Sequence, residues 1–210
     1  MTDPYLTPLG PQLPRRGNAF SRGFFTVLLR LLGWRVTGDF PDVRKAVLIV
    51  APHTSRFDGF IAVVSAFALG LRLSFFLKHS AFRFPWGGPL RCCGALPVDR
   101  EQEQDLVAHA AAQLRTHDRL LLAVAPEGRR RAAAHWQTGF YRIAHQAQVP
   151  IVCLAFDYAL REVRVVGLAH PTGNIERELP QIIALYRGIT PRHEDRLSAP
   201  LRALRAGPRR

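Results

Sequence analysis

The sequence predicts a single-domain α/β sandwich on a largely parallel sheet, preceded by an amphipathic N-terminal helix at a membrane interface. Short unbroken apolar runs, such as residues 46–51 and 120–125, have the length and composition of strands buried on both faces. Segments with helical patterning alternate with these runs, which is the order that places helices against a parallel sheet. A length of 210 residues suits one domain with short flanking segments.

The first elements are a leader and a helix. Proline and glycine are frequent at the start of the chain, so we expect residues 1–19 to form a flexible leader. Residues 20–36 follow as an amphipathic helix in which Arg22 and Arg30 interrupt an apolar and aromatic surface. This helix is too short to span a bilayer, which takes about 20 apolar residues. It either packs on the core of the domain or lies in a membrane interface.

Strands and helices then alternate through a domain expected over residues 40–190. The expected strands are residues 46–51, 73–77, 95–98, 120–125 and 151–156, and the expected helices are residues 60–71, 101–117, 136–148 and 175–186. Residues 161–166 alternate polar and apolar side chains, which predicts a half-exposed edge strand in a hairpin with the strand before it. Residues 191–210 carry several arginines and prolines, and we expect a loose Arg-rich tail.

Composition excludes several classes of protein. A hydrophobic share of 48% excludes a wholly disordered chain, and three cysteines are too few for a disulfide scaffold. No Cys/His spacing is typical of zinc, so no metal is expected. The net charge of +13 indicates either a surface that binds phosphate groups or a general bias toward arginine. No nucleic-acid-binding motif accompanies the charge, so nucleic acid is not an expected partner.

The first candidate for chemistry follows the strand at residues 46–51. Ser55 to Asp58 has the S-x-x-D form of a capping box, so a helix should begin there, with His53 just before it. The bend at the cap can bring His53 and Asp58 together. A carboxylate beside an imidazole fixes its tautomer and makes it a general base. The alternative is that Asp58 only caps the helix and His53 is an ordinary loop residue.

Two further polar segments also follow expected strands, where α/β folds place their sites. Glu127, Gly128 and the arginines at 129–131 follow the strand at residues 120–125. They either hold an anion such as phosphate or form a solvated basic loop. Asp99 and Arg100 follow the strand at residues 95–98 and allow the same two interpretations.

Together these segments resemble the glycerolipid acyltransferase family, of the lysophosphatidate (1-acylglycerol-3-phosphate) acyltransferase type. Residues 53–58 match its His-x4-Asp block, and residues 97–100 match its Pro-Val-Asp-Arg block. Residues 126–130 are similar to its Pro-Glu-Gly-Thr-Arg block, with Arg129 in place of the threonine, and residues 149–152 match its Val-Pro-Ile-Val strand. The matching blocks occur in the family's order along the chain.

The resemblance covers roughly residues 20–190 and identifies residues 40–190 as an acyltransferase domain. It implies transfer of a fatty acyl group from a thioester, acyl-CoA or acyl-ACP, to the hydroxyl of a lysophospholipid, most simply 1-acylglycerol-3-phosphate to phosphatidate. It also implies that His53 is the general base and that Asp58 orients it. The residues implied to hold the phosphate of the acceptor are Arg100, Glu127, Gly128 and Arg130. No cofactor is implied beyond the thioester co-substrate.

Amphiphilic substrates imply an enzyme that works at a bilayer surface. We therefore expect peripheral, monotopic attachment to the cytoplasmic face of the cell membrane through residues 20–36 and anionic lipids. Acyl carrier protein is a further expected partner where it carries the donor. Other interpretations stay open: acyl transfer to another lysolipid acceptor, a transacylase or hydrolase on the same scaffold, and a non-catalytic basic protein that binds nucleic acid or a membrane.

Overall fold

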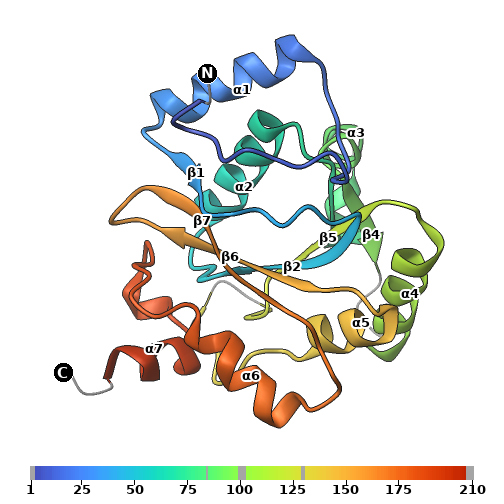
Figure 1. Cartoon of the computed structure of the whole chain (residues 1–210), viewed down its shortest axis with the longest axis vertical. Helices are drawn as coiled ribbons and strands as arrows, with labels where there is room; N and C mark the ends of the chain where they lie inside the picture. The colour runs from blue at the N-terminus through green and yellow to red at the C-terminus, as the bar shows by residue number, and fades with distance from the viewer. Residues whose placement is uncertain (1–2, 84, 99–102, 129–130, 207–210) are drawn as a thin grey trace.

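A single sheet organises the chain (Figure 1). The computed structural model describes residues 3–83, 85–98, 103–128 and 131–206. Within them, seven strands follow the order β1-β7-β6-β2-β5-β3-β4, and every neighbouring pair is parallel except β6 and β7. The strands are β1 (Arg35–Thr37), β2 (Lys45–Ala51), β3 (Leu73–Lys78), β4 (Ala95–Val98), β5 (Leu120–Val124), β6 (Ile151–Asp157) and β7 (Glu162–Ala169). The predicted α/β fold with a largely parallel sheet is confirmed.

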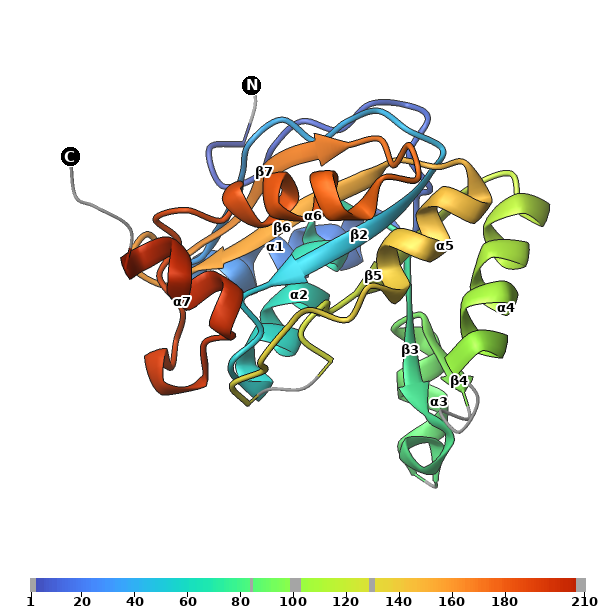
Figure 2. The same cartoon turned by 90° about the horizontal axis from the view of Figure 1, so that it is seen from below.

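Helices cover both faces of this sheet. They are α1 (Ala19–Leu31), α2 (Arg56–Leu69), α3 (Gly87–Cys92), α4 (Glu103–Thr116), α5 (Gly139–Ala147), α6 (Ile175–Ala184) and α7 (Ala199–Ala206), with short 3₁₀ turns η1 (His79–Phe82) and η2 (Glu194–Arg196). Figure 2 shows α5, α6 and α7 on one face and α1 behind the sheet on the other. Among the helices of the described residues, none combines the length and apolar character needed to cross a membrane.

Strand β2 shows why the apolar runs form buried strands. Val47 and Ile49 pack into the core under α4 and α5, whereas Ala46 and Leu48 pack into the core under α1 and α2. Successive side chains of a strand point to opposite faces, so a strand between two helical layers must be apolar at every position. This requirement explains the unbroken run that predicted the strand.

The sheet edge differs from the prediction. The hairpin of β6 and β7 is confirmed, but β7 is not an edge strand, because β1 pairs with its outer side in register from Arg35↔Glu162 to Thr37↔Arg164. The prediction that residues 35 and 36 belong to the N-terminal helix is wrong, because both lie in β1. In the structure that helix ends at Leu31, and Gly33 follows with a φ of 70°, a conformation that favours glycine and breaks the helix.

Both flanking segments pack more closely than a flexible leader and a loose tail would. Leu13 is fully buried, and the backbone N–H of Arg16 donates to the carbonyl of Gly70 at 2.9 Å. At the other end, Leu197 and the α7 residue Leu201 are buried against the core. Apolar residues within these proline- and arginine-rich stretches therefore anchor residues 3–18 and 191–206 to the domain.

Candidate active site

The loop between β2 and α2 forms the centre of the site. Ser55 is the N-cap of α2, and its Oγ accepts a hydrogen bond from the backbone N–H of Asp58 at 3.3 Å. In return, Asp58 Oδ2 accepts from the backbone N–H of Ser55 at 2.7 Å. This reciprocal pair is the predicted capping box, and it fixes Asp58 in the first turn of the helix.

The cap brings His53 and Asp58 together. His53 Nδ1 lies 3.4 Å from Asp58 Oδ2. The His53 side chain keeps 19% of its surface exposed, whereas the Asp58 side chain is fully buried. Since Nδ1 faces the carboxylate, Nε2 is the ring nitrogen left for a substrate. The predicted proximity of the two side chains is thus present in the structure.

Asp58 is surrounded by hydrogen-bond donors. Its Oδ2 accepts from the backbone N–H groups of Thr54 and Ser55, each at 2.7 Å. Its Oδ1 accepts from the Ser55 hydroxyl at 2.7 Å and from the Tyr158 hydroxyl. Burial raises the pKa of Asp58, but His53, Tyr158 and Ser55 outweigh it, so the pKa lies below its ordinary value. Asp58 is therefore ionised at neutral pH.

Tyr158 is a site residue that the sequence analysis missed. It lies just after β6, and its ring packs edge-on against Trp34 with centroids 4.9 Å apart. Burial and the hydrogen bond to Asp58 raise the pKa of the Tyr158 hydroxyl to about 12, so it stays a donor. No local sequence pattern marks Tyr158. It comes close to Asp58 because β6 pairs with β2, with Ala155 beside Ala51, which brings together the residues that follow the two strands.

Glu127 approaches His53 from the other side. It follows β5, the second neighbour of β2, and its Oε2 accepts from the backbone N–H of His53 at 2.6 Å. The residue is only 2% exposed, and its Oε1 has no hydrogen-bond partner among the described residues. Burial raises the pKa of Glu127 above its ordinary value, and the bond from His53 offsets this only in part. Glu127 therefore holds the backbone of the His53 loop.

The other predicted anion-binding residues are only partly visible. Gly128 follows Glu127 with a φ of 68°, in the turn after β5. Arg100 and Arg130 lie outside the described residues, as does Arg129. Among the described residues, no group of three or more His, Cys, Asp or Glu side chains is arranged to hold a metal ion.

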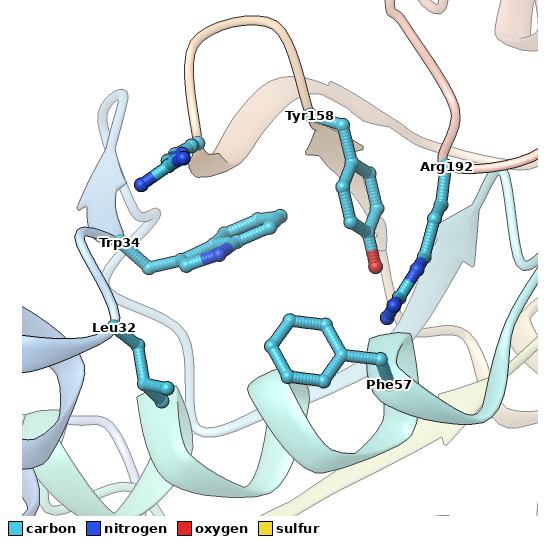
Figure 3. A pocket seen from close by; sticks show the side chains of 6 residues that line it. Leu32, Trp34, Phe57, Tyr158 and Arg192 are labelled. Atoms are coloured by element: carbon cyan, nitrogen blue, oxygen red, sulfur yellow. The ribbon is translucent and has the colours of Figure 1, made fainter.

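A pocket of about 370 Å³ adjoins the site (Figure 3). Its lining consists of Leu32, Trp34, Phe57, Tyr158, Arg161 and Arg192. Figure 3 shows Tyr158 and Arg192 side by side, with their polar ends directed toward Phe57. Phe57 directly precedes Asp58, so the pocket begins one residue from the buried carboxylate.

Comparison with known families identifies the family of the chain. A model of the family described as Acyltransferase matches residues 34–157, which is more than half of the chain and includes His53, Asp58 and Glu127. The chain belongs to the acyltransferase family. No curated protein matches the sequence.

A solved structure shares the fold of this acyltransferase. The chain is similar to PlsC, the 1-acyl-sn-glycerophosphate (LPA) acyltransferase of Thermotoga maritima, with a TM-score of 0.54 and 15% sequence identity. The alignment covers 76% of this chain and 72% of that chain. At this level of identity, the similarity shows a common α/β fold. The family match and the fold agree with the resemblance that the sequence blocks indicated.

Proposed function

We propose that this acyltransferase transfers a fatty acyl group from an acyl thioester, acyl-CoA or acyl-ACP, to the hydroxyl of a lysophospholipid. The simplest acceptor is 1-acylglycerol-3-phosphate, which gives phosphatidate. The observation that carries the proposal is the 3.4 Å approach of His53 Nδ1 to the buried, ionised Asp58. The family membership and the fold of PlsC, a protein described as acting on this acceptor, support it.

His53 supplies the general base. Its Nε2 takes the proton of the acceptor hydroxyl as the hydroxyl oxygen attacks the thioester carbonyl, because an alcohol is a poor nucleophile until that proton is removed. Asp58 holds the ring and stabilises the imidazolium that forms. The new C–O bond replaces the C–S bond, and the proton passes from His53 to the departing thiolate.

The backbone N–H groups of the loop around His53 are already used in hydrogen bonds to carboxylates. The backbone N–H groups of Thr54 and Ser55 both donate to Asp58, so they are not free to stabilise the oxyanion of the intermediate. Glu127 accepts from the N–H of His53, and we assign it to positioning this loop. Recognition of the acceptor phosphate by Arg100, Gly128 and Arg130 remains part of the proposal.

Attachment to a bilayer is proposed from α1. One face of this helix packs inward through the buried Leu29, and the other carries four exposed apolar side chains. Phe20 and Leu31 are 83% and 80% exposed, and Phe24 and Val27 lie between them at helical spacing. An apolar face of this kind, on a helix that also carries arginines, suits the interface of an anionic bilayer. We place the enzyme peripherally on the cytoplasmic face of the membrane.

A substitution of the base tests the function. His53→Ala should lower turnover about 10²–10⁴-fold with acyl-CoA or acyl-ACP and lysophosphatidate. Its melting temperature should stay near that of the wild type, because the imidazole is partly exposed. His170→Ala, at an exposed position, is the matched control. Product formed from lysolipid without a thioester would indicate a transacylase, and more than half of wild-type turnover in His53→Ala would refute the proposed mechanism.

A further inference from the structure

Residues 190–199 lie against the His53 loop, although they come from a part of the chain outside the family match. The match ends at residue 157, whereas these residues run from the segment after α6 through η2 to the first residue of α7. Leu197 and Ser198 are 2% and 0% exposed, so the segment is packed against the domain. Figure 2 shows the chain around α7 beside the arrowhead of β2. We call residues 190–199 the C-terminal bridge.

Backbone hydrogen bonds hold both ends of the C-terminal bridge. At its start, the carbonyl of Thr190 accepts from the backbone N–H of Tyr158 at 2.9 Å. At its end, the backbone N–H of Ala199 donates to the carbonyl of Ala133 at 2.8 Å. Tyr158 follows β6 and Ala133 follows β5, and these two strands flank β2 in the sheet. The bridge therefore crosses the end of β2, where the loop with His53 begins.

The middle of the bridge contacts Thr54, the residue that directly follows His53. The backbone N–H of His193 donates to Thr54 Oγ1 at 3.3 Å, and Arg196 Nη1 donates to the Thr54 carbonyl at 3.3 Å. The backbone N–H of Thr54 donates in turn to Asp58 Oδ2 at 2.7 Å. Thr54 is fully buried, and its N–H, its hydroxyl and its carbonyl are each hydrogen-bonded. The bridge thus supplies two of the three polar contacts of this residue.

These contacts bear on the position of the general base. The capping box fixes Asp58 relative to α2, but it leaves the backbone at His53 to be held from outside the loop. Glu127 holds one side, where its Oε2 accepts from the backbone N–H of His53 at 2.6 Å. The bridge holds the other side through Thr54. An imidazole whose backbone is fixed on both sides keeps one orientation, and a displacement of about 1 Å in a catalytic group can cost about 10²-fold in rate.

We infer that the C-terminal bridge positions the general base, with Arg196 and Thr54 as its positioning residues. Both act on His53 through the backbone of the loop, without contact to the reacting atoms. The inference rests on the proposed function, since His53 is the base in that mechanism, and it extends the catalytic machinery beyond the segment that the family model matches. The competing interpretation is that Arg196, whose side chain is 45% exposed, only adds stability to the fold.

Steady-state kinetics with lysophosphatidate and an acyl thioester separate these two interpretations. Arg196→Met keeps an unbranched side chain and removes the donor to Thr54. It should lower kcat about ten-fold or more, while both KM values change less than about two-fold, because the base is displaced and the substrates still bind. Arg196→Lys keeps a donor and should recover part of the lost kcat. Arg115→Met is the matched control, since Arg115 also donates to a carbonyl, that of Gln146 at 3.1 Å, and it should keep kcat within about two-fold.

A second pair of variants changes no charge. Thr54→Val removes the acceptor of the His193 N–H at nearly the same volume, and kcat should fall about five-fold or more. Thr54→Ser keeps the hydroxyl and should recover most of the kcat that Thr54→Val loses. Equal kcat values in the serine and valine variants would count against the inference.

Hydrogen exchange measures the position of the loop without any substrate. In Arg196→Met, the backbone amides of residues 52–58 should exchange at least about three-fold faster than in the wild type, because the loop opens more often. The amides of residues 46–51 in β2 should exchange at the wild-type rate. This measurement also serves if the buried Thr54→Val variant does not fold. Unchanged exchange over residues 52–58 would overturn the inference.

The outcomes also separate the bridge from the proposed function. If His53→Ala keeps more than half of wild-type turnover, the proposed mechanism is wrong and the role of the bridge falls with it. If His53→Ala is inactive but Arg196→Met has the wild-type kcat, only the inference about the bridge is wrong. A raised KM for one substrate at unchanged kcat in Arg196→Met would make Arg196 a substrate contact. That result would also overturn the inference, as would an equal loss of kcat in Arg115→Met.

Discussion

Replacing Tyr158 with phenylalanine removes one strong hydrogen bond, together with a long 3.5 Å contact between the Tyr158 and Ser55 hydroxyls, and leaves the ring in place. The lost bond is the one from the Tyr158 hydroxyl to Asp58 Oδ1, and the Ser55 hydroxyl still donates to that oxygen. A hydrogen bond to a charged group contributes about 1.5–3 kcal/mol. We expect a loss near the lower limit, because Asp58 is not left without donors. For a chain of this size that corresponds to a fall in melting temperature of about 3–6 °C.

The same substitution should change the pH dependence of catalysis. The bond from Tyr158 lowers the pKa of Asp58, so its removal should raise that pKa and make the carboxylate a stronger hydrogen-bond acceptor for the His53 ring. The imidazolium is then better stabilised, and the acidic limb of the kcat/KM profile should move to higher pH. The shift should be a few tenths of a unit, because one unit corresponds to about 1.4 kcal/mol and only part of the bond energy passes through Asp58.

Stability should follow pH in a defined direction. The pKa of Asp58 is depressed in the folded state, so the stability that its ionised form contributes is present above the ordinary pKa of about 3.9 and is lost below it. The difference in melting temperature between wild type and Tyr158→Phe should therefore be full at pH 7 and should shrink on acidification. Thermal unfolding at a series of pH values measures this trend.

Tyr141→Phe is the matched control for these measurements. Its hydroxyl also donates to a carboxylate, Glu178 Oε2 at 3.0 Å, but the pair joins α5 to α6 away from His53. It should lower the melting temperature without moving the pH profile. If Tyr158→Phe behaves in the same way, with wild-type turnover and an unshifted acidic limb, then Tyr158 only stabilises the fold and the reasoning is refuted.

Two other substitutions separate structure from function. Glu127→Gln should melt at the same temperature as the wild type or a higher one at pH 7–8, since its amide oxygen still accepts the backbone N–H of His53. Burial raises the pKa of Glu127, so the charged form costs stability as the pH rises through that pKa. In acid, where Glu127 is protonated, the difference in melting temperature should vanish. A loss of turnover above about 100-fold at unchanged melting would instead place Glu127 in contact with substrate. The double change Phe20→Ser and Leu31→Ser should lower binding to anionic vesicles at least about ten-fold in a sedimentation assay, since each buried side chain contributes about 1.5–3 kcal/mol. Leu168→Ser, at an exposed position on β7, should have little effect, and equal binding by all three proteins would exclude α1 as the contact.

The local features of this chain follow from local signals in the sequence. The apolar run of β2, the capping box and the proximity of His53 to Asp58 all depend on residues close together in the chain. Tyr158 reaches Asp58 only because β6 pairs with β2, which no local pattern specifies. The burial of Glu127 could not be predicted either, because it depends on the packing of the turn after β5 against the His53 loop.

The same reasoning explains the errors at the two ends. Apolar residues continue on both sides of Gly33 between residues 20 and 36, so hydrophobicity alone does not distinguish the exposed face of α1 from the buried Trp34 and β1 beyond it. Gly33 is the local sign that the helix ends before Trp34. It does not decide the matter, because a single glycine also occurs within helices. Residues 191–206 are rich in proline and arginine, which predicts an exposed tail. Leu197 and Leu201 are buried because they pack against the folded core, and this contact has no local sequence pattern.

The position of β2 between β5 and β6 determines how the catalytic loop is held. Glu127 from the β5 side binds the backbone of His53, and Tyr158 from the β6 side binds Asp58. The two carboxylates meet opposite environments: four donors favour the charge on Asp58, whereas burial with one unpartnered oxygen disfavours it on Glu127. Environments that separate two pKa values in this way assign the acid–base roles. Under the proposed mechanism, Asp58 is therefore the charged partner of the imidazolium that forms on His53, and Glu127 holds the backbone of the same loop.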